Sequence, residues 1–317
     1  MFDTVPALGL SPYEMMMLFV IWSFLGWAME VCVHTLKMGE YSDRGFLAMP
    51  LCPIYGFGAN IITVLLRDVL DDPLPLFVVS ALICTAFELM VGLLLKKVFH
   101  NQWWDYSDEP FNFHGYICLK VTLEWGFVCL IGETFIIPPI LKAVNLIPHP
   151  VGIIFLCIAA VLILIDTAVS FAAAKRLTLH IRQFAELNSK MYDSAEKLGS
   201  ALGTAALDTS AAVHENMAAA QVQADNLSAD IKESVSDAKR LIGMRYDAYM
   251  AFTADKAERR LLRAFPHMHP DKEILPESGT DLIAELREML RGNWINPLME
   301  GIREKLDMNI NELIEKK

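Results

Sequence analysis

Five long apolar runs dominate the chain, at about residues 14–36, 51–67, 74–95, 115–138 and 151–174. A helix of about 20 apolar residues crosses the hydrocarbon core of a bilayer, so each run is a candidate membrane span. The second run contains Pro53, Gly56 and Gly58. It is therefore either a span or a broken, re-entrant segment packed within protein. The pattern predicts an all-α membrane protein with about five transmembrane helices.

Two of the loops between these runs are similar to each other. The segment Asp43-Arg44-Gly45-Phe46-Leu47-Ala48-Met49-Pro50-Leu51-Cys52-Pro53-Ile54-Tyr55-Gly56-Phe57 has a degenerate copy 70 positions later, in His114-Gly115-Tyr116-Ile117 and Glu124-Trp125-Gly126-Phe127. Glu30 in the first run is likewise echoed by Glu88 in the third. We predict a parallel internal repeat of two helices each, over about 14–67 and 74–138, with 151–174 as an unpaired fifth helix.

The distribution of charge predicts the orientation. The net charge is −11, and most charged residues follow position 175. Among the ends of the runs, one alternating set is rich in Lys and Arg (Lys37, Arg44, Lys96, Lys97, Lys175, Arg176 and Arg182), whereas the other has only Arg67 and Lys142. By the positive-inside rule, the N-terminus is outside and the long C-terminal region is cytosolic. We therefore expect a transmembrane domain over residues 1–180.

The cytosolic region is expected to be helical. Residues from Val213 to Leu241 include Met217, Leu227 and Ile231 at alternating steps of four and three, which indicates a coiled coil or a long helical hairpin over 181–265. Amphipathic helices are predicted within 266–317. A coiled coil here would also allow the chain to form a homo-oligomer.

Ionisable residues inside the apolar runs are the candidates for a polar site. At about 1.5 Å per residue from the cytosolic ends, Glu30, Glu88, Lys120 and Asp166 all lie about 10 Å deep, with Glu124 somewhat deeper. A charge at this depth is costly unless it is paired, neutralised or hydrated, and we expect Lys120 and Arg44 to compensate two of the acids. The layer is either a cavity that binds a polar or cationic solute or an ion-pair network that fixes the helices.

Aromatic residues surround these positions. Tyr106 lies where an interfacial belt would place it. Tyr55 and Trp125 occupy matched places in the repeat beside Gly56 and Gly126, where they either pack the helices or line the cavity.

Several motifs carry a resemblance to a known family. They are Phe24-Leu25-Gly26-Trp27-Ala28-Met29-Glu30, Asp43-Arg44-Gly45-Phe46-Leu47 with Pro50, Cys52-Pro53-Ile54-Tyr55-Gly56, and Trp104-Asp105-Tyr106-Ser107 with Asn112 and Gly115. They resemble the bacterial membrane family described as putative ABC-transporter type IV, the CmpB-like permeases, to which the animal TMEM229-type proteins are similar. The resemblance covers about residues 12–180. It implies a permease in a bacterial cell membrane, and the candidate site residues are Glu30, Arg44, Tyr55, Glu88, Tyr106, Asn112, Lys120, Glu124, Trp125 and Asp166.

Two function classes follow. The first is a transporter permease subunit that moves a small polar or cationic solute. The second is a membrane-anchored interaction or sensor protein that uses its cytosolic coiled-coil tail. The sequence contains no P-loop and no hydrolase motif, so we expect no enzyme activity, no cofactor and no metal, and a separate ATPase subunit would have to supply ATP hydrolysis. An acidic tail also argues against binding to nucleic acid.

Overall fold

The computed structural model describes residues 9–39, 41–66, 72–215, 232–233, 235–245, 247–248, 250–252 and 255–270, with only the backbone described at 201 and 205–215. Of these, residues 9–176 and 257–270 form one compact unit, and residues 177–252 with 255–256 belong to a second.

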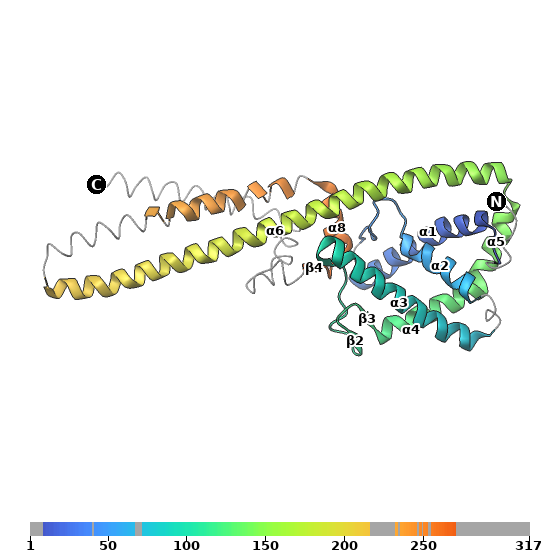
Figure 1. Cartoon of the computed structure of the whole chain (residues 1–317), viewed down its shortest axis with the longest axis horizontal. Coiled ribbons are helices and arrows are strands. Elements are labelled where there is room, and N and C mark those ends of the chain that lie inside the picture. Colours follow the sequence, from blue (N-terminus) through green and yellow to red (C-terminus); the bar gives the residue numbers. More distant parts are fainter. Residues whose placement is uncertain are drawn as a thin grey trace. The chain divides into compact units, whose positions relative to one another are not determined.

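The first unit is built almost entirely from helices (Figure 1). Its helices are α1 (Pro12–Met38), α2 (Pro53–Leu65), α3 (Pro73–Phe99), α4 (Leu119–Ile131), the π-helix η2 (Gly132–Ile136), α5 (Ile137–Leu146) and the first part of α6 (His149–Glu215). A later segment adds α8 (Lys256–Ala264). Two small antiparallel sheets pair β1 (Asn101–Gln102) with β4 (His269–Pro270) and β2 (Asn112–Phe113) with β3 (Ile117–Cys118).

Local sequence explains where α1 begins and ends. Ser11 and Glu14 form a capping box, in which Glu14 N–H donates to Ser11 Oγ at 3.2 Å and Ser11 N–H donates to Glu14 Oε2 at 2.8 Å. Pro12 follows at a position where its missing N–H is harmless. Gly39 ends the helix at φ +74°, a left-handed conformation that glycine adopts without strain.

Among the described residues, four helical stretches are long and apolar enough to cross a membrane: Pro12–Met38, Pro73–Phe99, Leu119–Leu146 and part of His149–Thr204. Apolar side chains on α6 are exposed, as expected for a surface that faces lipid, including Val151, Ile154, Ile158, Leu162 and Ile165. The chain is therefore a multi-pass α-helical membrane protein.

The expected second span, 51–67, is not a full-length helix. Its helix α2 has 13 residues, which extend about 20 Å and fall short of the roughly 30 Å hydrocarbon core. The backbone before Pro53 stays irregular, and Cys52 N–H donates to the carbonyl of Ser23, halfway along α1, at 2.8 Å. The predicted count of five spans is therefore not confirmed: α2 is one short, continuous helix that begins at Pro53 and contains both Gly56 and Gly58.

Side-chain contacts set the directions of the helices. The ring of Tyr13, near the start of α1, lies 5.3 Å from that of His149 at the start of α6. Phe99, at the end of α3, lies 5.1 Å from Phe171, beyond the middle of the first-unit part of α6. Asn145, near the end of α5, donates to Glu14 at 2.9 Å. Helices α1, α3 and α6 thus run in one direction, and α4 with α5 runs back.

The second unit contains the rest of α6 and a helical stretch that returns beside it. The ring of Phe252 packs 6.4 Å from Phe184, and Arg245 Nη1 lies 3.8 Å from Met191 Sδ. These contacts make the two stretches antiparallel. Most of the predicted heptad seam lies outside the residues whose side chains are described, and so do the helices predicted beyond residue 270, so both remain predictions.

Candidate functional site: a polar cavity in the helix bundle

Two glutamates in the bundle accept hydrogen bonds from aromatic residues at matched positions. Tyr55 Oη donates to Glu30 Oε1 at 2.7 Å, and Trp125 Nε1 donates to Glu88 Oε2 at 3.1 Å. The rings of Tyr55 and Trp125 lie 5.4 Å apart. The two helix pairs, α1 with α2 and α3 with α4, therefore meet through these aromatic rings.

A second contact also occurs twice. The rings of Phe19 and Phe57 are 4.9 Å apart, and so are those of Phe77 and Phe127. Each pair lies next to a glycine at a close helix approach. A Cβ at Gly56 would lie 2.4 Å from the carbonyl oxygen of Phe19.

Arg44, which was expected to compensate one of the acids, lies beside Glu30. Arg44 Nη2 lies 3.5 Å from Glu30 Oε2, and the Glu30 side chain is 37% exposed. The neighbouring Asp43 accepts a hydrogen bond from Trp27 Nε1 at 3.2 Å. This ion pair stands at the edge of the bundle rather than deep within it.

Glu88 is buried and has a different set of partners. In addition to Trp125, Tyr106 Oη donates to Glu88 Oε1 at 3.2 Å. Burial and the nearby carboxylate raise the pKa of Tyr106 above its ordinary value, so this phenol remains a donor. The carboxylate of Glu88 is thus held by two neutral donors.

Lys120 does not compensate these acids. Its ammonium group lies 2.6 Å from Glu109 Oε1, on the exposed side of α4, and Glu124 is exposed as well. The sequence prediction placed Lys120 by depth alone. Depth carries no information about the face of the helix, and the loop residue Glu109 provides a closer partner.

Asp166 stabilises the irregular chain that precedes α2. Its carboxylate accepts from the N–H groups of Ala48 and Met49 at 3.1 and 2.7 Å, and Ser170 Oγ lies 3.3 Å away. Non-helical backbone inside a membrane needs such partners, because lipid supplies none. The buried carboxylate of Asp166 thus holds this segment in place through hydrogen bonds.

Asn112 organises a loop. Its side-chain amide donates to the carbonyls of Ser107 and Glu109, and its oxygen accepts from Gly115 N–H at 3.2 Å. Gly115 has φ +72°, so the loop requires glycine there. Asn112 is exposed and supports the loop that carries Tyr106.

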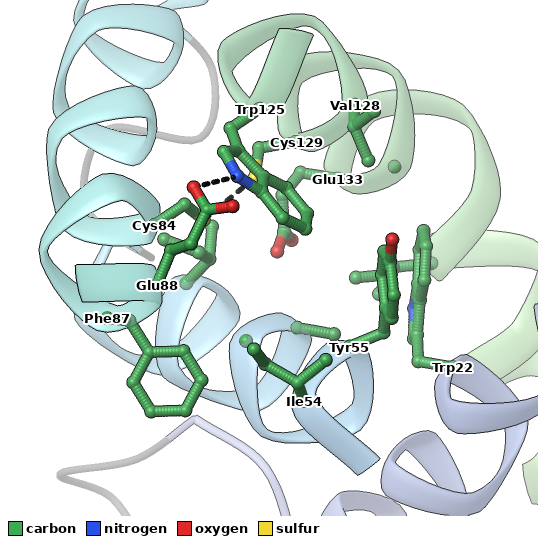
Figure 2. A pocket seen from close by; sticks show the side chains of 15 residues that line it. Trp22, Ile54, Tyr55, Cys84, Phe87, Glu88, Trp125, Val128, Cys129 and Glu133 are labelled. Carbon is green, nitrogen blue, oxygen red and sulfur yellow. Dashed lines mark hydrogen bonds between the residues drawn. The ribbon is translucent and has the colours of Figure 1, made fainter. Parts of the chain in front are cut away.

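A cavity of about 40 Å³ lies between α1, α2, α3 and α4 (Figure 2). It is lined by three of the paired residues above, Tyr55, Glu88 and Trp125, and by Trp22, Phe87, Cys84, Cys129 and Glu133 among others. In Figure 2 the carboxylate of Glu133 points into the same space that Glu88 and Trp125 border. Two carboxylates therefore share one small cavity.

The sequence analysis did not include Glu133 among the candidates. Its carboxylate is 7% exposed; Oε1 accepts from Thr63 Oγ1 at 2.8 Å, and Oε2 has no hydrogen-bond partner among the described residues. Glu133 lies in the π-helix, which forms where Pro138 and Pro139 cannot donate to the preceding turn. Such π-turns are frequent at functional sites. The signal in the sequence was a carboxylate followed closely by two prolines in an apolar run.

The described residues contain no group of three or more His, Cys, Asp and Glu side chains that could hold a metal ion. Cys84 and Cys129 line the cavity with their sulfur atoms 3.6 Å apart, and both are free thiols.

Residues 257–270 cover the loops beside Glu30. Arg260 donates to the carbonyls of Gly45 and Phe46 at 3.1 and 2.6 Å, and Arg44 donates to the carbonyl of Ala264. Strand β4 pairs with β1, and His269 Nε2 lies 3.2 Å from Asp105 Oδ2. Burial lowers the pKa of Arg260 despite the nearby Asp43 and Asp166.

Comparison with known families gives one match. Residues 17–171 match the family described as putative ABC-transporter type IV. The first unit of this chain is therefore similar to that family over these residues. The match contains the motifs noted in the sequence and the whole cavity, and it ends before the second unit. No curated protein and no solved structure matches the chain.

Proposed function

We propose that the chain is the membrane subunit of a bacterial transporter, and that it moves a small polar or cationic solute through the cavity between α1, α2, α3 and α4. The observation that carries this proposal is the pair of buried carboxylates, Glu88 and Glu133, which line one cavity. Intramembrane acids are costly and usually mark a solute or proton path. The similarity of residues 17–171 to the family described as putative ABC-transporter type IV supports the same function.

The recurring contacts support a duplicated helix pair as the frame of this path. Glu30 with Tyr55 and Glu88 with Trp125 occupy equivalent places, and the two phenylalanine pairs repeat the same spacing. Transporters often place their solute between such repeats. In this proposal the N-terminus is outside, and the second unit lies in the cytosol.

We assign no reaction to this chain. A separate ATPase subunit or an ion gradient would supply the energy, and the second unit would offer a surface for such a subunit or for a second copy. The alternative, a membrane-anchored interaction or sensor protein, leaves the buried carboxylates of the cavity without a role, so we favour it less.

Ligand-dependent thermal unfolding tests the proposal without a partner subunit. Full-length protein in detergent is heated with a panel of ammonium, guanidinium, amino-acid and polyol solutes. A solute that binds the folded state at 100 times its Kd stabilises it by about 2.7 kcal/mol. We expect at least one solute to raise the unfolding midpoint of the wild type but not that of Glu88→Gln or Glu133→Gln. A panel that affects all three proteins equally would contradict the proposal.

A further inference from the structure

The cavity contains acids without a matching cation. Its carboxylates belong to Glu88 and Glu133, and its lining residues include no Lys or Arg. Among the described residues near it, Arg44 pairs with Glu30 and Lys120 pairs with Glu109. An unpaired carboxylate in an apolar surrounding is too costly to persist, so it either holds a proton or takes up a cation from outside.

One oxygen of the pair is available to a ligand. Glu133 Oε2 is buried and has no hydrogen-bond partner within the described part of the chain, whereas both oxygens of Glu88 already accept bonds from Tyr106 and Trp125. Trp22 Nε1, from another residue that lines the cavity, also lacks a partner there. A buried polar atom without a partner is uncommon in proteins, so these two atoms mark a place where a polar ligand could bind. An N–H donor beside Glu133 would satisfy its Oε2.

The size and walls of the cavity narrow the choice of ligand. A volume of about 40 Å³ holds about three water-sized groups at roughly 10–15 Å³ each. Four aromatic side chains border it: Trp22, Tyr55, Phe87 and Trp125. Aromatic faces attract organic cations. A bare metal ion would need more oxygen ligands than the two carboxylates and the Tyr55 hydroxyl supply.

We propose that this cavity binds a small primary ammonium cation, which enters in exchange for a proton held by the Glu133 carboxyl group. The inference rests on the proposed function and names the solute class of the same site. The O–H bond of the carboxyl group breaks, and its proton passes to water. The ammonium N–H groups then donate to the carboxylate oxygens. No electrons are transferred, and the charge of the cavity is the same before and after the exchange.

The other titratable groups around the two carboxylates favour this exchange. They come from every neighbouring element: Glu30 on α1, Tyr55 on α2, Cys84 on α3, Glu124 and Cys129 on α4, and Tyr106 in the loop. Every one of them is neutral or negative, and none becomes a cation. The carboxylates among them favour a proton or a bound cation on Glu133 over a bare charge, and the neutral groups supply no competing cation.

Isothermal titration calorimetry of the purified full-length protein with methylammonium chloride tests the exchange. Titrations in phosphate and in HEPES, which differ in ionisation enthalpy, give the number of protons released. We expect about one proton per bound cation. Affinity should rise by about tenfold per pH unit while the carboxyl group is protonated, because the proton and the cation compete.

Three variants complete the test. Glu133→Gln should lose proton release and weaken binding by about tenfold to a hundredfold, the worth of a hydrogen bond to a charged group. Glu133→Asp keeps the titrating group, so it should bind more weakly and still release a proton. Glu109→Gln changes a carboxylate in the loop before α4, where it pairs with Lys120 outside the cavity, and should match the wild type. Size-exclusion profiles show which variants fold. If Glu133→Gln does not fold, the proton release and affinity of Glu133→Asp test the exchange.

Three results would overturn this inference: no binding of methylammonium, binding without proton release, or equal binding by wild type and Glu133→Gln. None of these three results contradicts the proposed function if another solute stabilises the wild type through Glu88 and Glu133. The proposed function is wrong if no solute in the thermal-unfolding panel stabilises the wild type through Glu88 and Glu133.

Discussion

The hydroxyl group of Tyr55 donates a 2.7 Å hydrogen bond to Glu30, and this bond joins two helices whose residues are 25 positions apart. Trp125 makes the equivalent bond to Glu88 from the second helix pair. Each bond anchors a glutamate carboxylate across a contact between two helices.

Removal of either donor should destabilise the bundle. Tyr55→Phe and Trp125→Phe each leave a glutamate oxygen without its donor, at a cost of about 1.5–3 kcal/mol for a bond to a charged group. Tyr192→Phe, an exposed tyrosine on α6, is the matched control and should have no measurable effect. Thermal unfolding in detergent measures the differences. Equal midpoints for Tyr55→Phe and Tyr192→Phe would refute this role of the hydroxyl group.

Substitution of two glycines by alanine should cost different amounts of stability, because one glycine lies against backbone and the other against a side chain. A Cβ at Gly56 would lie 2.4 Å from the backbone oxygen of Phe19, whereas a Cβ at Gly126 would meet the ring of Phe77 at 2.7 Å. A ring can rotate away more easily than a helix backbone can move. We therefore expect Gly56→Ala to destabilise the protein by more than Gly126→Ala, with a cost of about 1–3 kcal/mol or more for overpacking.

Gly58 provides the control on the same helix. Nothing lies within 4 Å of a Cβ there, so Gly58→Ala should stabilise α2 by about 0.5–1 kcal/mol. Thermal unfolding of the three variants side by side gives the order. A Gly58→Ala protein as unstable as Gly56→Ala would contradict the packing described here.

Arg260 should hold residues 257–270 in place. Arg260→Gln removes the guanidinium that donates to Gly45 and Phe46, while Arg263→Gln changes an exposed arginine one turn later on α8. Hydrogen–deuterium exchange of peptides from this segment should speed up in Arg260→Gln and remain unchanged in Arg263→Gln. If both variants exchange alike, Arg260 does not anchor the segment.

Attachment of β4 should also weaken in acid. Burial raises the pKa of Asp105, but hydrogen bonds from Ser107 and the adjacent His269 lower it more, so it lies below the ordinary value. A carboxyl group with a lowered pKa stabilises the fold above its ordinary pKa, near pH 4, and this stabilisation disappears as the pH falls through the lowered value. Exchange of the β4 peptide, corrected for the intrinsic rate, should therefore increase below about pH 4. Asp105→Asn should lack this acid step, and a step that persists in it would have another source.

Sequence periodicity and hydropathy predicted the helices well because apolar runs and caps are local signals. The matched positions of Tyr55 and Trp125 were predicted from the duplication, whereas their hydrogen bonds to Glu30 and Glu88 were not. Helix α2 lies within the predicted run 51–67, but its short length was not predicted, because the chain before it is held by a bond from Cys52 to a distant carbonyl on α1. For Asp166 only a depth in the membrane was predicted, and its role arises from a loop that is far away in sequence.

The two acidic residues of the cavity illustrate the same limit. Glu88 was expected from its place in the repeat, whereas Glu133 enters the cavity through a π-turn that alters the ordinary helical spacing. Lys120 shares a depth with the acids but lies on another face of α4. The position of a residue along a helix gives the depth of its side chain in the membrane. The direction in which the side chain points depends on how the helices pack.

Cysteine accessibility tests the central claim, a polar cavity that solute can enter, most directly. In a chain with its six native cysteines replaced, single cysteines are placed at 88 and 133 in the cavity and at 22 in its wall. Position 165, an exposed isoleucine on the apolar surface of α6, serves as the control. Sealed vesicles of both orientations are treated with a small, positively charged methanethiosulfonate. The account predicts that 88 and 133 react from at least one side while 165 stays inert. If 88 and 133 are as inert as 165 in folded protein, the carboxylates form a dry lock between helices and the transport path proposed here is wrong.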